Sequence, residues 1–242
     1  MKKEFKNLNL FLRSHGKTDF YLDYGLNKSF SEEDCEKVVS FLDQNTAASN
    51  HVEKSRGAIL EINSGGIDLI IRKYHRGGLI SKFNSNLHFL KSYYYVRPVL
   101  EFKALNKMLS AGLKVPRPRG FIFRDHMFFY ESAIILDKID NTIPLQNLSA
   151  DVGFNLFKCA EQAGHVAKLA LKQGICHTDL HPANVLINKD GVYLIDFDKP
   201  IFFKSGIEFH QNNMISRWRR FVDKYGLGDD LLFGFEKGIR SN

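Results

Sequence analysis

Residues 176–200 read CHTDLHPANVLINKDGVYLIDFDKP, and this segment is the most informative about the fold. Two apolar runs, Val185–Ile187 and Val192–Ile195, flank the polar residues Asn188–Gly191. An Asp-Gly pair between segments rich in β-branched residues is a strong hairpin signal. We therefore expect a β-hairpin here, with polar residues at the outer end of each strand.

Those polar residues are Asp179 and Asn184, just before the hairpin, and Asp196, just after it. Two carboxylates and a carboxamide suit Mg²⁺, which takes hard oxygen ligands and usually only one or two protein carboxylates. In kinases an Asp accepts the hydroxyl proton, an Asn five residues later binds metal, and the Asp that opens a D-F-x motif binds metal. Any one of the three residues would more simply cap a turn. Their order together predicts phosphoryl-transfer chemistry.

Composition indicates a globular protein. Hydrophobic residues make up 44% of the 242 residues and charged residues 25%, which leaves room for one large domain or two lobes. No apolar run approaches the roughly 18 residues of a membrane-spanning helix, and the N-terminus lacks the apolar core of a signal peptide. Cys35, Cys159 and Cys176 show no metal-ligand spacing, which favours a reducing cytoplasm.

The chain is basic, with a formal net charge of +7. Residues 76–131 hold ten Lys or Arg and three Asp or Glu, so this window alone accounts for that excess. A basic face suits nucleic acid, an anionic membrane surface or an anionic substrate, and a solvated surface is the simpler explanation of charge alone. No nucleic-acid-binding module accompanies the charge, so we expect no nucleic-acid partner.

Two further segments leave alternatives open. Residues 79–95, LISKFNSNLHFLKSYYY, interleave aromatic residues and Leu with Lys. They suit either a core-packing insertion or a surface that rests on a bilayer interface. Residues 212–221 predict a basic helix, whose Arg217, Arg219 and Arg220 are either solvated or face an anionic acceptor.

Residues 58–71 predict a second hairpin, and Arg72 and Lys73 end its second strand. A cation at this place suits nucleotide phosphates, as the strand lysine does in kinases. Because side chains alternate along a strand, Arg72 and Lys73 point to opposite faces, and only one of them can contact the phosphates. The sequence leaves open which one does. Arg56 and Gly57 precede the hairpin and suit either a reduced phosphate loop or an ordinary turn.

A helix is expected from Arg97 to Gly112, because proline is tolerated in a first turn and glycine commonly ends a helix. Its Glu101 is placed to pair with the strand cation, which is how kinases position the phosphates. The other reading is a Glu that faces solvent. The remaining elements are expected as a helix capped at Ser31, strands at 120–123, 126–130 and 132–139, and a helix at 151–173.

These elements predict an α+β chain of two domains. Residues 1–139 would form an N-terminal extension and a nucleotide-binding antiparallel sheet with one long helix. Residues 140–242 would form a compact, mostly helical catalytic domain that carries the hairpin. The polar residues Asp140–Thr142 suit a hinge between the two.

Several motifs together resemble one known group of proteins. RKYHRGGL at 72–79, Glu101, VPRP at 115–118, HTDLHPAN at 177–184 and LIDFD at 194–198 occur in this order. They are similar to motifs of the 3-deoxy-D-manno-octulosonic acid (Kdo) kinases of Gram-negative bacteria, in the lipopolysaccharide kinase family. The similarity covers roughly residues 20–225. Its HTDLHPAN and DFD motifs are shared with many kinase-like phosphotransferases, whereas the Arg-Gly-Gly segment is more specific to this group.

The resemblance implies a two-lobed protein-kinase-like fold and ATP-dependent phosphorylation of a Kdo hydroxyl, at O-4, on Kdo-lipid A. Such a protein would be cytoplasmic and peripheral on the anionic inner-membrane surface. The resemblance makes Asp179 the catalytic base, Asn184 and Asp196 the Mg²⁺ ligands, and Glu101 the helix carboxylate. The resemblance leaves the identity of the strand cation open, because heptose kinases of the group suggest Lys73 and Kdo kinases suggest Arg72.

Rival functions remain at this stage. The motifs also fit a heptose kinase, an aminoglycoside-type phosphotransferase or a nucleotide-binding pseudokinase scaffold, and a basic RNA-binding module fits less well. Thr178 replaces the Arg of His-Arg-Asp, and Asp198 replaces the Gly of Asp-Phe-Gly. Because no long activation segment follows, control by loop phosphorylation is not expected.

Overall fold

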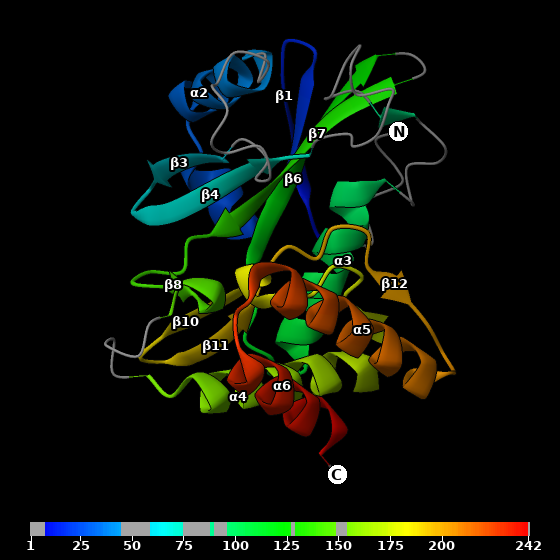
Figure 1. The fold of residues 1–242 in the computed structure, drawn as a ribbon. Coiled ribbons are helices and arrows are strands. Elements are labelled where there is room, and N and C mark those ends of the chain that lie inside the picture. Colours follow the sequence, from blue (N-terminus) through cyan, green and yellow to red (C-terminus); the bar gives the residue numbers. More distant parts are fainter. Residues whose placement is uncertain are drawn as a thin grey trace. The chain divides into compact units, whose positions relative to one another are not determined.

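The computed structural model describes residues 8–44, 59–74, 88–89, 96–126, 129–148 and 154–241. The chain divides into two compact units, and Figure 1 shows the elements of both. The first unit comprises Met1–Phe102 and Arg117–Lys138, and the second comprises Lys103–Pro116 and Ile139–Asn242. The functional division into 1–139 and 140–242 stays a prediction, and residues 103–116 group with the second unit.

An antiparallel sheet of seven strands forms the frame of the first unit (Figure 1). Its main path runs β1-β2-β6-β7-β4-β3, and β5 pairs with β7. The strands are β1 (Phe11–His15), β2 (Thr18–Leu22), β3 (Ile59–Ser64), β4 (Ile67–Lys73), β5 (His88–Phe89), β6 (Pro118–His126) and β7 (Phe129–Asp137). The helices of this part are α1 (Tyr24–Ser29), α2 (Glu32–Asp43) and the start of α3 (Arg97–Ser110).

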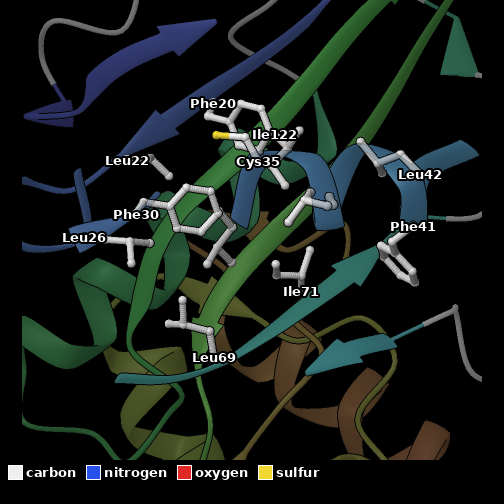
Figure 2. Close-up of a cluster of buried hydrophobic side chains, with 13 residues drawn as sticks. Phe20, Leu22, Leu26, Phe30, Cys35, Phe41, Leu42, Leu69, Ile71 and Ile122 are labelled. Carbon is white, nitrogen blue, oxygen red and sulfur yellow. The ribbon is translucent and has the colours of Figure 1, made fainter. Parts of the chain in front are cut away.

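Alternation along the strands gives this sheet two apolar faces. Phe20 and Leu22 of β2, Ile122 of β6, and Leu69 and Ile71 of β4 pack in one buried cluster with residues of α1 and α2 (Figure 2). The capping box of α2 fixes where that helix begins, because Ser31 Oγ accepts from Asp34 N and Asp34 accepts from Ser31 N. The cap predicted at Ser31 is confirmed.

The opposite face of the sheet buries the residues between those positions. Tyr21, Phe121 and Phe123 pack there with Val99 and Phe102 of α3. Because side chains alternate along a strand, a residue of β4 faces α2 when its number is odd and faces away from α2 when it is even. This rule separates the two candidate cations, Arg72 and Lys73.

The structure corrects the strands predicted after residue 118. Two long strands, β6 and β7, replace three short ones, and they pair from Pro118 with Leu136 to His126 with Phe129. The sequence between them, residues 127–128, contains no Gly or Pro, the usual sequence signals of a tight turn. The β1–β2 hairpin, which turns at Gly16 with a φ of 58°, was not predicted either.

The second unit is mostly helical and carries two small sheets. Its helices are α4 (Leu156–Lys172), α5 (Ile207–Tyr225) and α6 (Asp229–Arg240), with short turns η5 (Leu145–Asn147) and η7 (Pro182–Asn184). Its strands are β8 (Ile143–Pro144), β9 (Ile175–Cys176), β10 (Val185–Asn188), β11 (Gly191–Leu194) and β12 (Ile201–Phe202). The predicted hairpin is confirmed as β10–β11, with Val185 opposite Leu194 and Asn188 opposite Gly191.

Helices α4 and α6 lie side by side (Figure 1). A Cβ at Gly238 would meet the backbone of Glu161, and one at Gly164 would meet the backbone of Ile239 at 2.6 Å. Helix α5 is fixed to α6 by Trp218, whose Nε1 donates to Leu231 O at 2.9 Å. These contacts hold α5 in place, and α5 borders the predicted catalytic residues.

No helix within the described ranges is long and apolar enough to cross a membrane. The three cysteines are buried and form no disulfide.

Candidate active site

The β10–β11 hairpin brings Asn184 and Asp196 together. Its outermost strand pair is Val185 with Leu194, and Ile195 N extends the ladder by donating to Asn184 O at 3.0 Å. Asp196 is the next residue, so it leaves the hairpin beside Asn184. The proximity predicted from the sequence is confirmed.

Asp196 has a left-handed backbone conformation, with a φ of 62°, and Lys199 has a φ of 57°. Non-glycine residues adopt this region at a conformational cost, and such residues cluster at functional sites. The neighbours of Asp196 hold it there. Ile195 is hydrogen-bonded through both its N–H, to Asn184 O, and its C=O, to the His177 ring. The Phe197 ring packs with the His177 ring at 4.3 Å between centroids.

His177 connects the loop that carries Asp179 to the end of the hairpin. The fully buried ring lies with Nε2 2.9 Å from Ile195 O, and Nδ1 accepts from Asp179 N at 3.2 Å. These partners require a neutral ring with its proton on Nε2. Burial lowers the pKa of His177, against a smaller opposing effect of the carbonyl of Ile195 and of the Asp196 and Asp179 carboxylates.

Asp179 presents its carboxylate to solvent, with 56% of the side chain exposed. Arg217 Nε donates to Asp179 Oδ1 at 2.5 Å, and His181 Nε2 lies 3.7 Å from Oδ2. The His181 imidazole, followed by the Arg217 guanidinium, lowers the pKa of Asp179 to about 2. The carboxylate is therefore ionised at neutral pH, which is the form that can accept a hydroxyl proton.

Helix α5 supplies the side of the site that sequence reasoning left undecided. The Phe221 ring stacks on the His181 ring, with centroids 4.2 Å apart, and the Arg217 guanidinium lies over Phe221 at 5.8 Å. Arg217 and Phe221 are four residues apart, so they share one helix face. That spacing was visible in the sequence, but the sequence did not show that this face meets Asp179.

Asn184 and Asp196 offer the hard oxygen ligands that Mg²⁺ prefers. Asn184 Nδ2 donates to Asp179 O at 3.0 Å, which fixes the carboxamide, and Oδ1 accepts no hydrogen bond from any residue that the structure describes. Among those residues no three His, Cys, Asp or Glu side chains gather as a larger metal cluster. One carboxylate and one carboxamide oxygen fit an ion that keeps several waters and binds phosphate oxygens.

In the first unit, Arg72 and Glu101 form a buried ion pair. Arg72 Nη2 lies 2.7 Å and 2.5 Å from the two carboxylate oxygens of Glu101, which is fully buried. The Tyr74 hydroxyl donates to Glu101 Oε2 at 2.5 Å. Burial, followed by the Glu101 carboxylate, raises the pKa of Tyr74 well above its usual value, which keeps this donor protonated. The predicted pairing of Glu101 with a strand cation is present.

Lys73 points to the opposite face, as alternation requires. It is 2% exposed, and its Nζ donates to Leu42 O of α2 at 2.5 Å. Burial lowers the pKa of Lys73. Of the two candidates, only Arg72 pairs with Glu101.

Other predicted site features lie outside the described residues or have a structural explanation. Arg56 and Gly57 lie outside the described residues, and so does 79–95 except for the two residues of β5. Within the basic window, Arg119 pairs with Asp137 at 2.5 Å and with Asp23 at 3.2 Å. Part of the positive charge is therefore neutralised within the first unit.

Comparison with known proteins assigns the chain to a family. The model of the Lipopolysaccharide kinase (Kdo/WaaP) family matches residues 39–202, more than half of the chain. The chain belongs to this family. The match includes the Arg72–Glu101 pair and the whole segment from Asp179 to Asp196.

Curated relatives within the family are named 3-deoxy-D-manno-octulosonic acid kinase. The protein of Mannheimia succiniciproducens is 35% identical over 180 residues, which cover 70% of this chain and 73% of the relative. That of Photobacterium damsela subsp. piscicida is 28% identical over 181 residues, which cover 72% of each. That of Xylella fastidiosa (strain M23) is 27% identical over 164 residues, and the match spans 67% of this chain and 65% of the relative.

A solved structure of the same family shows the fold. The protein titled "WaaP in complex with acyl carrier protein" matches with a TM-score of 0.52, covering 86% of this chain and 82% of that one, at 14% identity. At this identity the likeness concerns the fold alone. The predicted α+β, two-lobed protein-kinase-like fold is confirmed.

The departures of this family member from protein kinases have a structural basis. Thr178 Oγ1 donates to Asp198 O and Lys199 O at 3.4 Å and 3.3 Å, so it ties the loop before Asp179 to the backbone after Asp196. From there the chain passes directly through β12 into α5. No activation segment intervenes in this described part of the chain, as the sequence predicts.

Proposed function

We propose that this protein transfers the γ-phosphoryl group of ATP to a hydroxyl of Kdo, at O-4, in Kdo-lipid A during lipopolysaccharide core biosynthesis. The observation that carries the proposal is the grouping of Asp179, Asn184 and Asp196 around one hairpin. Family membership supports the same reading, and so do the curated relatives named 3-deoxy-D-manno-octulosonic acid kinase.

Asp179 is the proposed catalytic base. Its exposed carboxylate accepts the proton of the sugar hydroxyl as that oxygen bonds to the γ-phosphorus, while the bond from phosphorus to the β-phosphate oxygen breaks and ADP leaves. A carboxylate with a pKa near 2 is a weak base, so its main contribution is to orient the hydroxyl and take its proton late. Phosphoryl transfer depends mostly on such positioning.

Asn184 and Asp196 are the proposed ligands of Mg²⁺. When bound, the ion would neutralise charge on the phosphates. The chain's own part is to hold two oxygen ligands in fixed positions. The hairpin ladder does this for Asn184, and the bonds of Ile195 to Asn184 and His177 do it for Asp196.

Arg72 is the proposed contact of the nucleotide phosphates, and Glu101 positions it. Lys73 is not proposed for this role because its ammonium is buried against α2. Arg56 and Gly57, which precede β3 in the sequence and lie outside the described residues, are proposed to act as a reduced phosphate loop. Both assignments concern ATP, which we propose as the phosphoryl donor.

The proposed acceptor is a lipid, so the protein is proposed to act at the cytoplasmic face of the inner membrane as a peripheral protein. The Kdo carboxylate and the lipid A phosphates are anionic, and a chain with a net charge of +7 is attracted to such a surface. This attraction is screened beyond a Debye length of about 8 Å at physiological salt.

The test incubates the purified protein and γ-labelled ATP with Kdo-lipid A, heptosylated core, free sugars and an aminoglycoside, and then locates the phosphate. We expect transfer to Kdo-lipid A, with the phosphate on O-4 of Kdo. Transfer to heptose or to the aminoglycoside instead would replace Kdo as the acceptor. ATP binding without transfer to any of them would contradict kinase activity and favour a scaffold.

A further inference from the structure

In this structure Arg217 forms an ion pair with Asp179, the proposed catalytic base. Its Nε donates to Asp179 Oδ1, one of the two carboxylate oxygens that face a substrate hydroxyl in the proposed mechanism. The side chain of Arg217 is 26% exposed and that of Asp179 is 56% exposed. A ligand in solution can therefore reach both partners of the pair.

The guanidinium of Arg217 retains N–H donors that a ligand can use. Of its five N–H groups, only Nε takes part in a hydrogen bond with a residue that the structure describes. Guanidinium groups bind carboxylates through two parallel hydrogen bonds, a geometry that Asp179 does not use here. Because ion pairs at exposed positions are weak, exchange of Asp179 for another carboxylate requires little free energy.

A cavity of about 150 Å³ lies along the same helix face. It is lined by His210, Asn213 and Met214 of α5, by the loop Cys176–Thr178 and by Ile201. Residues 210, 214 and 217 follow one another at helical spacing, so the side of α5 that lines the cavity leads to Arg217. The cavity also touches Thr178, the residue before Asp179.

The cavity combines polar groups with apolar walls, as ligand-binding sites do. His210 Nδ1 is buried there and has no hydrogen-bond partner within the described residues. The Asn213 carboxamide adds a donor and an acceptor. A ligand seated against these groups would have its polar substituents within the reach of α5.

We propose that Arg217 selects an acidic acceptor sugar by leaving Asp179 for the carboxylate of that sugar. The exchange frees Asp179 Oδ1 to accept the hydroxyl proton, so the acidic group of the acceptor both binds and uncovers the base. A neutral sugar leaves the ion pair in place. This inference rests on the proposed function, because it assigns the acceptor side of the same site.

The test compares Arg217→Gln with Arg219→Gln, a matched control. Arg219 lies on the same helix and pairs with a carboxylate at the same distance of 2.5 Å, but that partner is Glu236 of α6. The acceptors are Kdo-lipid A, its Kdo methyl ester and a form with the lipid A phosphates removed. KM and kcat are measured for each, together with ATP hydrolysis in the absence of acceptor.

In the wild type and in Arg219→Gln, we expect the methyl ester to raise KM about 10- to 100-fold, the worth of a charged hydrogen-bonded pair. In Arg217→Gln this discrimination should vanish and hydrolysis of ATP by water should increase, because Asp179 is no longer covered. Removal of the lipid A phosphates should leave the effect of Arg217 unchanged.

The inference would be overturned if Arg217→Gln still had a higher KM for the methyl ester than for Kdo-lipid A. It would also be overturned if Arg219→Gln lost this difference in KM to the same extent as Arg217→Gln. An effect of Arg217 that depends on the lipid A phosphates and not on the Kdo carboxylate would overturn it too. If the wild type transfers phosphate to none of these acceptors, the proposed function fails. Binding of the Kdo monosaccharide, measured by calorimetry in the three proteins, still tests the carboxylate contact separately.

Discussion

Glu101 shows how one buried charge organises the predicted nucleotide side of the site. It has no exposed surface, yet Arg72 and the Tyr74 hydroxyl provide three hydrogen bonds to its carboxylate. A buried ion pair adds little net stability, but removing one partner is costly because it leaves the other charge uncompensated. The pair therefore keeps Arg72 in one orientation.

A substitution at Arg72 should lower stability more than one at Lys73. Arg72→Ala should lower the free energy of unfolding by about 3–5 kcal/mol, because the buried carboxylate of Glu101 loses its ion pair with the guanidinium. Lys73→Met should change it by about 1 kcal/mol, the cost of one hydrogen bond to Leu42 O. Urea unfolding and the KM for ATP measure both effects. A higher KM for ATP in Lys73→Met than in Arg72→Ala would show that the strand cation is assigned wrongly.

His177 should make stability depend on pH. Burial lowers the pKa of His177 in the folded protein, so the unfolded chain binds the proton first. Its contribution is complete above the unfolded pKa of about 6.5 and decreases as the pH falls toward the folded pKa. Urea unfolding at pH 7.5 and 5.5 should show a larger loss in the wild type than in His177→Gln. Equal losses would mean that the ring is not held neutral.

For single residues, the sequence predicted which residue types form the site but not all of the side chains that they contact. Alternation required Arg72 and Lys73 to face opposite ways, but the choice depended on which face α2 covers. No residue of β4 carries that information. Arg217 was recognised as basic, whereas its contact with Asp179 depends on the packing of α5 and α6, which the local sequence does not encode.

Among the elements, the α4–α6 pair depends on glycines. Gly164 and Gly238 let the two helix backbones approach more closely than side chains would allow. Because α6 in turn fixes α5 through Trp218, this contact supports the face of α5 that meets Asp179. We expect it to be intolerant of added volume.

Gly238→Ala should therefore destabilise the protein by about 1–3 kcal/mol, the usual cost of overpacking. The control is Gly25→Ala in α1, where the nearest atom to the added Cβ lies 3.5 Å away. That change should stabilise by about 0.4–1 kcal/mol, because it reduces the entropy of the unfolded chain. Thermal unfolding of both variants checks the contrast, and a neutral Gly238→Ala would contradict the close packing.

The elements with strong local signals were the ones predicted correctly. The β10–β11 hairpin has an Asp-Gly pair between apolar runs, and α2 has a capping box. By contrast, α6 begins after Gly228 without a side-chain cap, and the β6–β7 turn lacks Gly and Pro. Tertiary packing, not local propensity, determines such elements.

Considered as a whole, the chain is basic, but its charge is not all available to a partner. Arg119 and Arg124 each make two ion pairs within the first unit. Reversing the charge of Arg119 would therefore alter stability before it altered the affinity for a lipid acceptor. Basic residues that lack such pairs are better probes of membrane attraction. Exposed Arg220 on α5 is one, because it forms no ion pair with a residue that the structure describes.

The account as a whole depends on Asp179 acting as the base of a phosphoryl transfer. The decisive measurement is phosphate transfer from labelled ATP to Kdo-lipid A by Asp179→Asn, with Asp190→Asn in the exposed hairpin turn as the matched control. Asp179→Asn should lower the rate by about 10²–10⁴-fold while nucleotide affinity stays unchanged, and the control should match the wild type. Near-wild-type transfer by Asp179→Asn would contradict the account.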